Sequence, residues 1–427
     1  MTVNYRIEKM KRKLLKQIRN EWRSNLWLGI ELLIVSVVMW YITDNIFCKT
    51  AILNEPRGFN TDHCYLIDYS QLSSQSPDFI PDQTYEEANA DLLTFIDRLE
   101  KRPEIECVAM GQNAYFYNSS NSGTYMACDT FNTSAAGYLV RRYVSPEFPK
   151  VFRIHGANGE SPEKLAEILE DRNGFIISDN AFKRGYGIEH MNEFFGKDFY
   201  NYANSDTLVL KASYVPTRYD DYSALEWAVS MIMPYPKEYY KSLNEMFVRV
   251  RDNMDKDFIE NLMNDADRHF RIGNYYIASV RSFDDIRTIH QRSESSEMRN
   301  YLVGALFLAI NIFLGLLGSF WFRTRQRVPE IAIRKANGAT RSDIFRRVIG
   351  EGLLLLLIVT PIAAVIDWII AHFELNSYYN GAFFDPLRFI VCILISSAFM
   401  ALMIVLGIMI PANRAMKIAP AKALMSE

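Results

Sequence analysis

Few side chains in this sequence are spaced for covalent or metal chemistry. The chain has 427 residues with six histidines and five cysteines, and none of these fall at the short intervals that hold a metal ion. Neither the phosphate-binding pattern G-x-x-x-x-G-K-[ST] nor a nucleophile–base motif occurs in it. We therefore expect no catalytic residue, no metal site and no cofactor held by this chain.

The cysteines are too few to form the disulfide framework of a domain this large. They are Cys48, Cys64, Cys107, Cys128 and Cys392. Cys107 and Cys128 could pair in an oxidising compartment, but we expect buried free thiols.

Two carboxylates, Glu31 and Asp367, lie inside long apolar runs. A charge in the middle of a bilayer costs about 2.5–3.5 kcal/mol on insertion scales, so such residues often have a function. They could form a polar relay or lock a dimer. The sequence favours a simpler interpretation, in which Glu31 lies near the membrane interface beside an arginine and Asp367 reaches outside water.

The most informative charged segment is 323–351, RTRQRVPEIAIRKANGATRSDIFRRVIGE. Its basic side chains outnumber the three acidic ones, Glu330, Asp343 and Glu351. They are Arg323, Arg325, Arg327, Arg334, Lys335, Arg341, Arg346 and Arg347. A basic loop between two apolar spans is held on the cytoplasmic side of a membrane.

Within this segment the sequence predicts a short helix and the start of another. Pro329 suits a first helical position, and Gly338 suits a helix end. Thr340, with Asp343 three residues later, is a weaker form of the capping box that opens a helix. The residues expected to form this coupling loop are Pro329, Glu330, Ile331, Ile333, Arg334, Lys335, Gly338, Ala339, Thr340 and Asp343. A capped helix beneath a membrane domain is suited to being pushed by a cytoplasmic partner.

Four apolar segments are long enough to cross a bilayer, which needs about 20 residues each. They are 26–47, 301–322, 352–371 and 389–410. The positive-inside rule is satisfied if 1–25, 323–351 and 411–427 are cytoplasmic. Both termini are then inside the cell, and 48–300 and the short loop 372–388 lie outside.

Charge separates the expected outside domain from the ends of the chain. Segment 48–300 holds 27 Lys and Arg against 39 Asp and Glu, whereas 1–25 holds eight basic residues against two acidic ones. The basic residues flank apolar spans rather than forming one surface, which argues against nucleic acid as a partner. Apolar positions in 3–23 predict an amphipathic helix along the inner membrane surface, so we expect contact with lipids.

Segment 48–300 alternates strand and helix patterns. Helices are expected over 84–101, 161–173 and 255–270, and strands over 63–70, 105–117, 124–128, 175–178, 207–214, 246–250 and 275–280. This favours an α+β domain of two subdomains, with a boundary between about 125 and 215. A helix capped by Ser282 is expected to run unbroken over 284–322 as a stalk into the second span. The expected fold class is therefore a membrane α-helical protein with four transmembrane helices and a large α+β extracytoplasmic domain inserted between spans 1 and 2.

Two segments resemble a known family. Residues 329–352, PEIAIRKANGATRSDIFRRVIGEG, resemble the cytoplasmic loop of the MacB/FtsX-like ABC permeases, whose pattern is close to EIGIRKALGATRRDI…Q…EG. The tail 411–424, with Pro411, Arg414 and Pro420, resembles the family ending P-A-x-R-A-x-x-I-x-P-A-x-A-L. Asn337 and Ala419 depart from these patterns. Weaker likeness to the family's periplasmic core is found in 144–152 and 175–197.

The resemblance implies an FtsX-like permease domain over about 301–420 in a multi-pass protein of the inner (plasma) membrane. It also implies a second permease, as a homodimer or heterodimer, and an ABC ATPase subunit in whose groove the loop helix sits. With about 25 residues before the first span and no phosphate loop, we expect ATP and Mg to bind to that separate subunit. Closure of the ATPases would then move the outside domain, a process called mechanotransmission.

Two functions fit this layout. One is an ABC transporter permease that exports or extracts a substrate from the inner membrane, handing it to a periplasmic or outer-membrane partner. The other is an FtsX-type regulator that transmits ATPase motion to a periplasmic hydrolase or senses a peptide. Neither requires an active site on this chain.

Overall fold

The structure is a computed structural model that describes residues 22–118, 122–128, 139–201, 207–326 and 328–417. It divides into two compact units. We call Met1–Ala51 with Ser296–Glu427 the helical unit and Ile52–Ser295 the sheet unit. Most of the predicted amphipathic helix at 1–25 lies outside the described residues.

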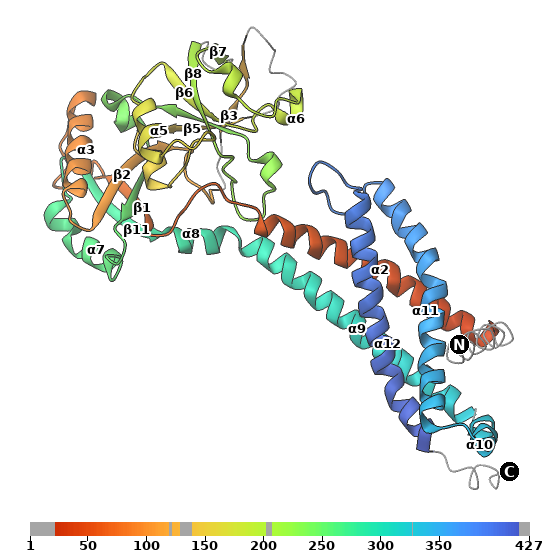
Figure 1. The fold of residues 1–427 in the computed structure, drawn as a ribbon. Helices are drawn as coiled ribbons and strands as arrows, with labels where there is room; N and C mark the ends of the chain where they lie inside the picture. Colours follow the sequence, from red (N-terminus) through yellow and green to blue (C-terminus); the bar gives the residue numbers. More distant parts are fainter. Residues whose placement is uncertain (1–21, 119–121, 129–138, 202–206, 327, 418–427) are drawn as a thin grey trace. The chain divides into compact units, whose positions relative to one another are not determined.

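The helical unit is built from four long helices and one short one (Figure 1). These are α2 (Trp22–Asn54), α9 (Arg292–Gln326), α10 (Val328–Ala336), α11 (Arg341–His372) and α12 (Pro386–Lys417). Among the described residues, α2, α9, α11 and α12 each contain a stretch that is long and apolar enough to cross a membrane. Each of them contains one of the four spans predicted from the sequence.

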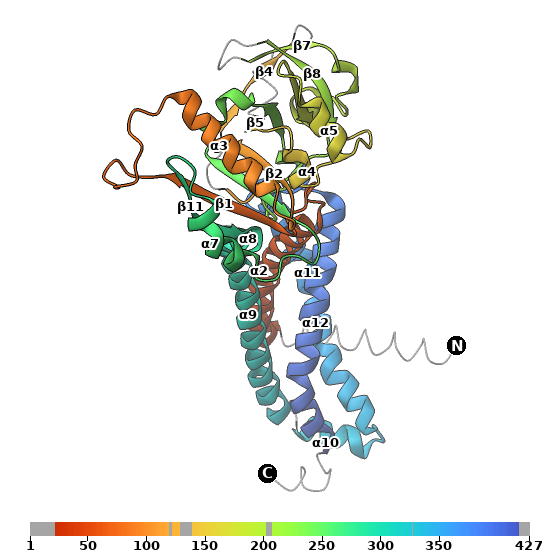
Figure 2. The same ribbon diagram turned by 90° about the vertical axis from the view of Figure 1, so that its left-hand side faces the viewer.

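All four long helices contribute to one apolar core. Leu28 of α2, Ile312 of α9, Leu355 of α11 and Ile404 of α12 are buried in it. Helices α11 and α12 lie side by side (Figures 1 and 2). Side chains such as Leu306 and Phe307 point outward and are exposed, as expected for helices that face lipid.

Two helix boundaries differ from the prediction. The expected helix over 284–322 is interrupted at Gln291, where ψ is 3°, so that α8 (Phe283–His290) and α9 are separate helices. Phe283 and Ile286 are buried in the core of the sheet unit, and this long-range packing directs α8. In the helical unit, α12 does not end with the predicted span at 410. It continues through Pro411 to Lys417, although a proline removes one helical hydrogen bond.

The sheet unit is organised around one mixed sheet in the order β11-β1-β10-β2-β5-β9-β6-β8-β7-β4, with β3 on β5. Its strands are β1 (Cys64–Gln71), β2 (Ile105–Gln112), β3 (Gly123–Thr124), β4 (Met126–Ala127), β5 (Leu139–Val144), β6 (Gly174–Ser178), β7 (Asp198–Asn201), β8 (Thr207–Tyr214), β9 (Ser230–Pro234), β10 (Glu245–Val250) and β11 (Tyr275–Ser282). The pairs β5–β9 and β6–β8 are parallel, and the others are antiparallel.

Helices cover both faces of the sheet. They are α3 (Tyr85–Glu100), α4 (Phe148–Val151), α5 (Pro162–Ile168), α6 (Lys183–Tyr186) and α7 (Phe258–His269), with short 3₁₀ turns at Asn192–Phe194, Leu225–Trp227 and Lys237–Ser242. Along β2, Val108 and Met110 join the core beneath α3 and α7, whereas Ala109 joins the core beneath α4, α5 and α8. This alternation follows from the two-residue period of a strand.

The expected division into two subdomains is not observed, because one sheet runs through the whole unit. The strands β5 and β9, which the sequence analysis did not predict, connect its two halves. In contrast, the predicted helix after Thr84 is confirmed. Thr84 and Glu87 form a capping box at the start of α3.

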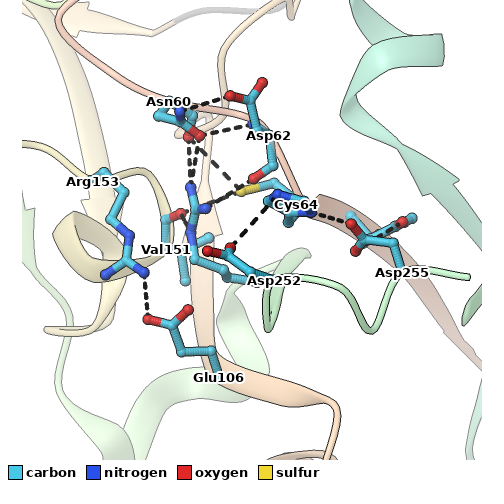
Figure 3. Close-up of polar contacts among 11 residues, drawn as sticks. Asn60, Asp62, Cys64, Glu106, Val151, Arg153, Asp252 and Asp255 are labelled. Atoms are coloured by element: carbon cyan, nitrogen blue, oxygen red, sulfur yellow. Dashed lines mark hydrogen bonds and ion pairs between the residues drawn. The ribbon is translucent and has the colours of Figure 1, made fainter.

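A buried arginine of β10 binds the chain before β1 and the end of α4. Figure 3 shows the residues that accept its hydrogen bonds, Asn60, Asp62 and Val151. Arg249 of β10 is 3% exposed. Its guanidinium donates to the carbonyl of Val151 at 2.6 Å, to that of Asp62 at 2.8 Å and to that of Asn60 at 2.9 Å. Arg153 and Glu106 form a separate ion pair nearby at 2.7 Å. The chain before β1 and the end of α4 are therefore held by one side chain.

We predict that Arg249→Met lowers the free energy of unfolding of the sheet unit by about 2–4 kcal/mol, because it removes the hydrogen bonds of a buried charged group to three backbone carbonyls. The measurement is denaturant unfolding of the full chain, followed by tyrosine and tryptophan fluorescence. Arg251→Met is the matched control, since Arg251 is exposed and its side chain donates only to the carbonyl of Pro103 among the contacts described. Equal destabilisation by the two variants would contradict the prediction.

Candidate functional site

The candidate site is α10 and the turn that joins it to α11. Pro329 is the second residue of α10, where the missing amide hydrogen removes no helical bond. Gly338 follows the helix with φ at +89°, a conformation that suits glycine. The amide of Gly338 donates to the carbonyl of Lys335, and that of Ala339 to the carbonyl of Arg334, both at 3.0 Å. This is a Schellman motif, which satisfies the last carbonyls of the helix.

The next helix, α11, begins at Arg341, with Thr340 as its N-cap. Thr340 Oγ1 accepts from the amide of Asp343 at 3.2 Å, and the Asp343 carboxylate accepts from the amide of Thr340 at 3.1 Å. The capping box predicted from the sequence is thus confirmed. The helix it opens, α11, is long: it continues from Arg341 to His372 and includes the third predicted span.

Only one face of α10 is packed. Ile331 is 7% exposed and contacts Ile344 of α11, and Ala332 is fully buried. Ile333 points the other way and is 52% exposed. The sequence analysis treated both isoleucines as apolar contact points, but the structure separates an inward one from an outward one.

Charged side chains flank this face. Glu330 pairs with Arg334 at 2.7 Å and lies 3.8 Å from Arg347 of α11, which also approaches Glu351 at 3.7 Å. Glu330 and Arg334 are partly exposed, so the pair contributes little stability. Lys335 lies half-buried at the end of the same helix. The surface of α10 therefore combines an exposed isoleucine with several cations.

The tail motif contributes a further contact within the helical unit. The guanidinium of Arg414 lies 3.9 Å from the ring centroid of Trp321, which is cation–π geometry. Pro411 is buried inside α12. Pro420, the third residue of the predicted motif, lies outside the described residues.

The expectations for the two intramembrane carboxylates were wrong in part. Asp367 does not reach water, since it is 2% exposed between the helices. Glu31 lies against α9, where a Cβ on Gly315 would collide with its carboxylate. Among the described residues no arginine pairs with Glu31.

A buried ion pair was missed by the sequence analysis. Asp44 of α2 lies 3.2 Å from Arg388 of α12, and both are at most 3% exposed. Asn376 donates to the Asp44 carboxylate at 3.1 Å, which ties the loop after α11 to the same pair. The available signal was that Asp44 is an acid inside the first predicted span, while Arg388 directly precedes the fourth.

The residues that the structure describes include neither a metal-ligand cluster nor a disulfide. No group of three or more His, Cys, Asp or Glu side chains there could hold a metal ion. All five cysteines are free. Burial raises the pKa of Cys64 and of Cys107 to about 12, so neither is a thiolate at neutral pH.

Comparison with known families identifies the region that carries this site. The family described as FtsX-like permease C-terminal matches residues 302–420. This region is an FtsX-like permease domain. The match begins within α9 and includes α10, α11 and α12, so the loop and the tail belong to one permease domain. Its role is of the ABC transporter permease type.

The remaining comparisons add less. A crystal structure of the periplasmic region of MacB from Actinobacillus actinomycetemcomitans is similar over 56% of this chain and 97% of that chain. The identity is 12% and the TM-score is 0.31, a value too low to support a fold assignment. A search of curated proteins found no match.

We predict that Thr340→Ala loosens the start of α11. Loss of a side-chain N-cap costs about 1 kcal/mol, which corresponds to roughly fivefold faster exchange of the Asp343 amide. Hydrogen exchange with mass spectrometry on the purified protein measures this rate. Thr340→Ser keeps the acceptor oxygen and should exchange like the wild type, and an unchanged rate in Thr340→Ala would contradict the assignment.

Proposed function

We propose that this chain is the transmembrane permease subunit of an ABC transporter that couples ATP hydrolysis on a separate cytoplasmic ATPase to movement of its extracytoplasmic domain. The FtsX-like permease domain supports an ATPase partner. In this proposal ATP and Mg bind to that partner, and this chain holds no catalytic residue. The sheet unit lies on the periplasmic side of the inner membrane, and both termini lie in the cytoplasm.

The observation that carries the proposal is the outward side chain of α10. Ile333 is exposed on a helix whose other face is already buried by Ile331 and Ala332. Burying one isoleucine side chain contributes about 1.5–3 kcal/mol to association. The neighbouring cations, Arg334 among them, suit an acidic rim around an apolar groove. The ATPase would therefore bind α10 through Ile333.

Motion can pass from α10 into the membrane because α10 is fixed to α11 at three points. These are the turn at Gly338, the apolar contact of Ile331 with Ile344 and the approach of Arg347 to Glu330. A second permease, either a copy of this chain or a different one, would complete the membrane part. The proposal assigns export or extraction of a substrate from the inner membrane to this assembly.

We predict that Ile333→Asp weakens binding of the ATPase subunit at least about tenfold, because it replaces a buried contact by a charge that must be desolvated. Copurification of the ATPase with the tagged permease, and its affinity in detergent, measure the effect. Ile289→Asp is the matched control, since Ile289 is also an exposed isoleucine but belongs to the sheet unit. Unchanged ATPase binding in Ile333→Asp would contradict the proposed coupling role of α10.

A further inference from the structure

A small polar cavity lies inside the helical unit between α2, α11 and α12. Its volume is about 10 Å³ for the centre of a water-sized particle, enough for a single water or ion. Its polar lining consists of Ser36, Thr360, Asp367, Ser396 and Ser397. Among the described residues that line it, Asp367 carries the sole ionisable side chain. The cavity is separate from α10 and has no part in the proposed ATPase contact.

Two polar atoms at this cavity lack a hydrogen-bond partner. Asp367 is 2% exposed, and its Oδ1 atom is buried without a hydrogen-bond partner among the described residues. Ser36 Oγ is also buried without a hydrogen-bond partner among the described residues. An unpaired carboxylate in a dry interior is unstable, so something must neutralise it.

Two of the hydroxyls that line the cavity have already used their hydrogens. Thr360 Oγ1 donates to the carbonyl of Leu356 at 2.8 Å, and Ser396 Oγ donates to the carbonyl of Ile393 at 3.1 Å. Each hydroxyl carries a single hydrogen, so these oxygens can offer only lone pairs to the cavity. The lining therefore combines one carboxyl group with several hydroxyl oxygens, of which those of Thr360 and Ser396 offer only lone pairs.

We propose that Asp367, with the hydroxyl oxygens of Ser36, Thr360 and Ser396, binds one sodium ion. Hard cations take oxygen ligands, and the four residues that carry these oxygens line one common space. A single carboxylate balances one positive charge, whereas a divalent ion would leave an uncompensated charge in the membrane interior. The space for one particle also excludes the water shell that magnesium retains.

Sodium-dependent stability of the full-length chain in detergent tests this site. Sodium chloride replaces choline chloride at neutral pH and constant ionic strength while the unfolding temperature Tm is followed. We expect Tm to rise by about 2–4 °C and then to saturate, because an ion that binds only the folded state stabilises it. Asp367→Asn should abolish this rise, and Ser396→Ala should shift the midpoint at least about threefold to higher sodium. Glu31→Gln is the matched control and should keep the wild-type response.

Three results would overturn the proposal. They are a wild-type Tm that does not depend on sodium, an undiminished rise in Asp367→Asn, and a Tm that responds to pH but not to sodium. The third would show that a proton neutralises Asp367. If Asp367→Asn does not fold, binding of radioactive sodium to the wild type and to Ser396→Ala decides instead, with about one ion per chain expected for the wild type.

Discussion

The turn Gly338–Thr340 determines what α10 can do, because it fixes both helix ends within three residues. On one side the Schellman bonds of Gly338 and Ala339 close α10, and on the other the Thr340–Asp343 capping box opens α11. These bonds satisfy part of the backbone groups at both helix ends and so oppose fraying. In the proposed function, a force on α10 would therefore be applied directly to α11.

The length of α11 gives this turn its importance. With 32 residues α11 is about 48 Å long, more than the roughly 30 Å of the hydrocarbon core. One continuous helix, with Pro361 in its interior, thus extends from the turn through the third predicted span to His372. Beyond it, Asn376 is bonded to Asp44, which is paired with Arg388 of α12. The turn and this ion pair hold the two ends of α11, and α11 lies along α12 between them.

Local features of this structure could be predicted from the sequence, and long-range ones could not. Hydropathy located the four spans, and Thr84 and Thr340 located two helix starts, because capping depends on residues three positions apart. No glycine or proline marks the break at Gln291. We attribute it instead to the packing of α8 into the core of the sheet unit. The central strands β5 and β9 owe their position to partners far away in the chain.

The same distinction applies to the site. The sequence identified α10 and its stop signal, but it could not tell the buried Ile331 from the exposed Ile333, which depends on where Ile344 lies. It also placed Asp367 in water, although hydroxyls from its own helix and from two other helices line the same cavity. Periodicity shows that a helix has faces, and only the tertiary fold shows which face is covered.

The central claim is that the outward face of α10 binds a separate ATPase. Site-specific photocrosslinking in cells tests it most directly, with a photoreactive amino acid placed at position 333 or, as a buried comparison, at position 331. We predict a crosslink from Ile333 to a nucleotide-binding subunit and none from Ile331 to that subunit. A position 333 that crosslinks only to lipid, or crosslinks to the subunit no more than position 331 does, would contradict the account.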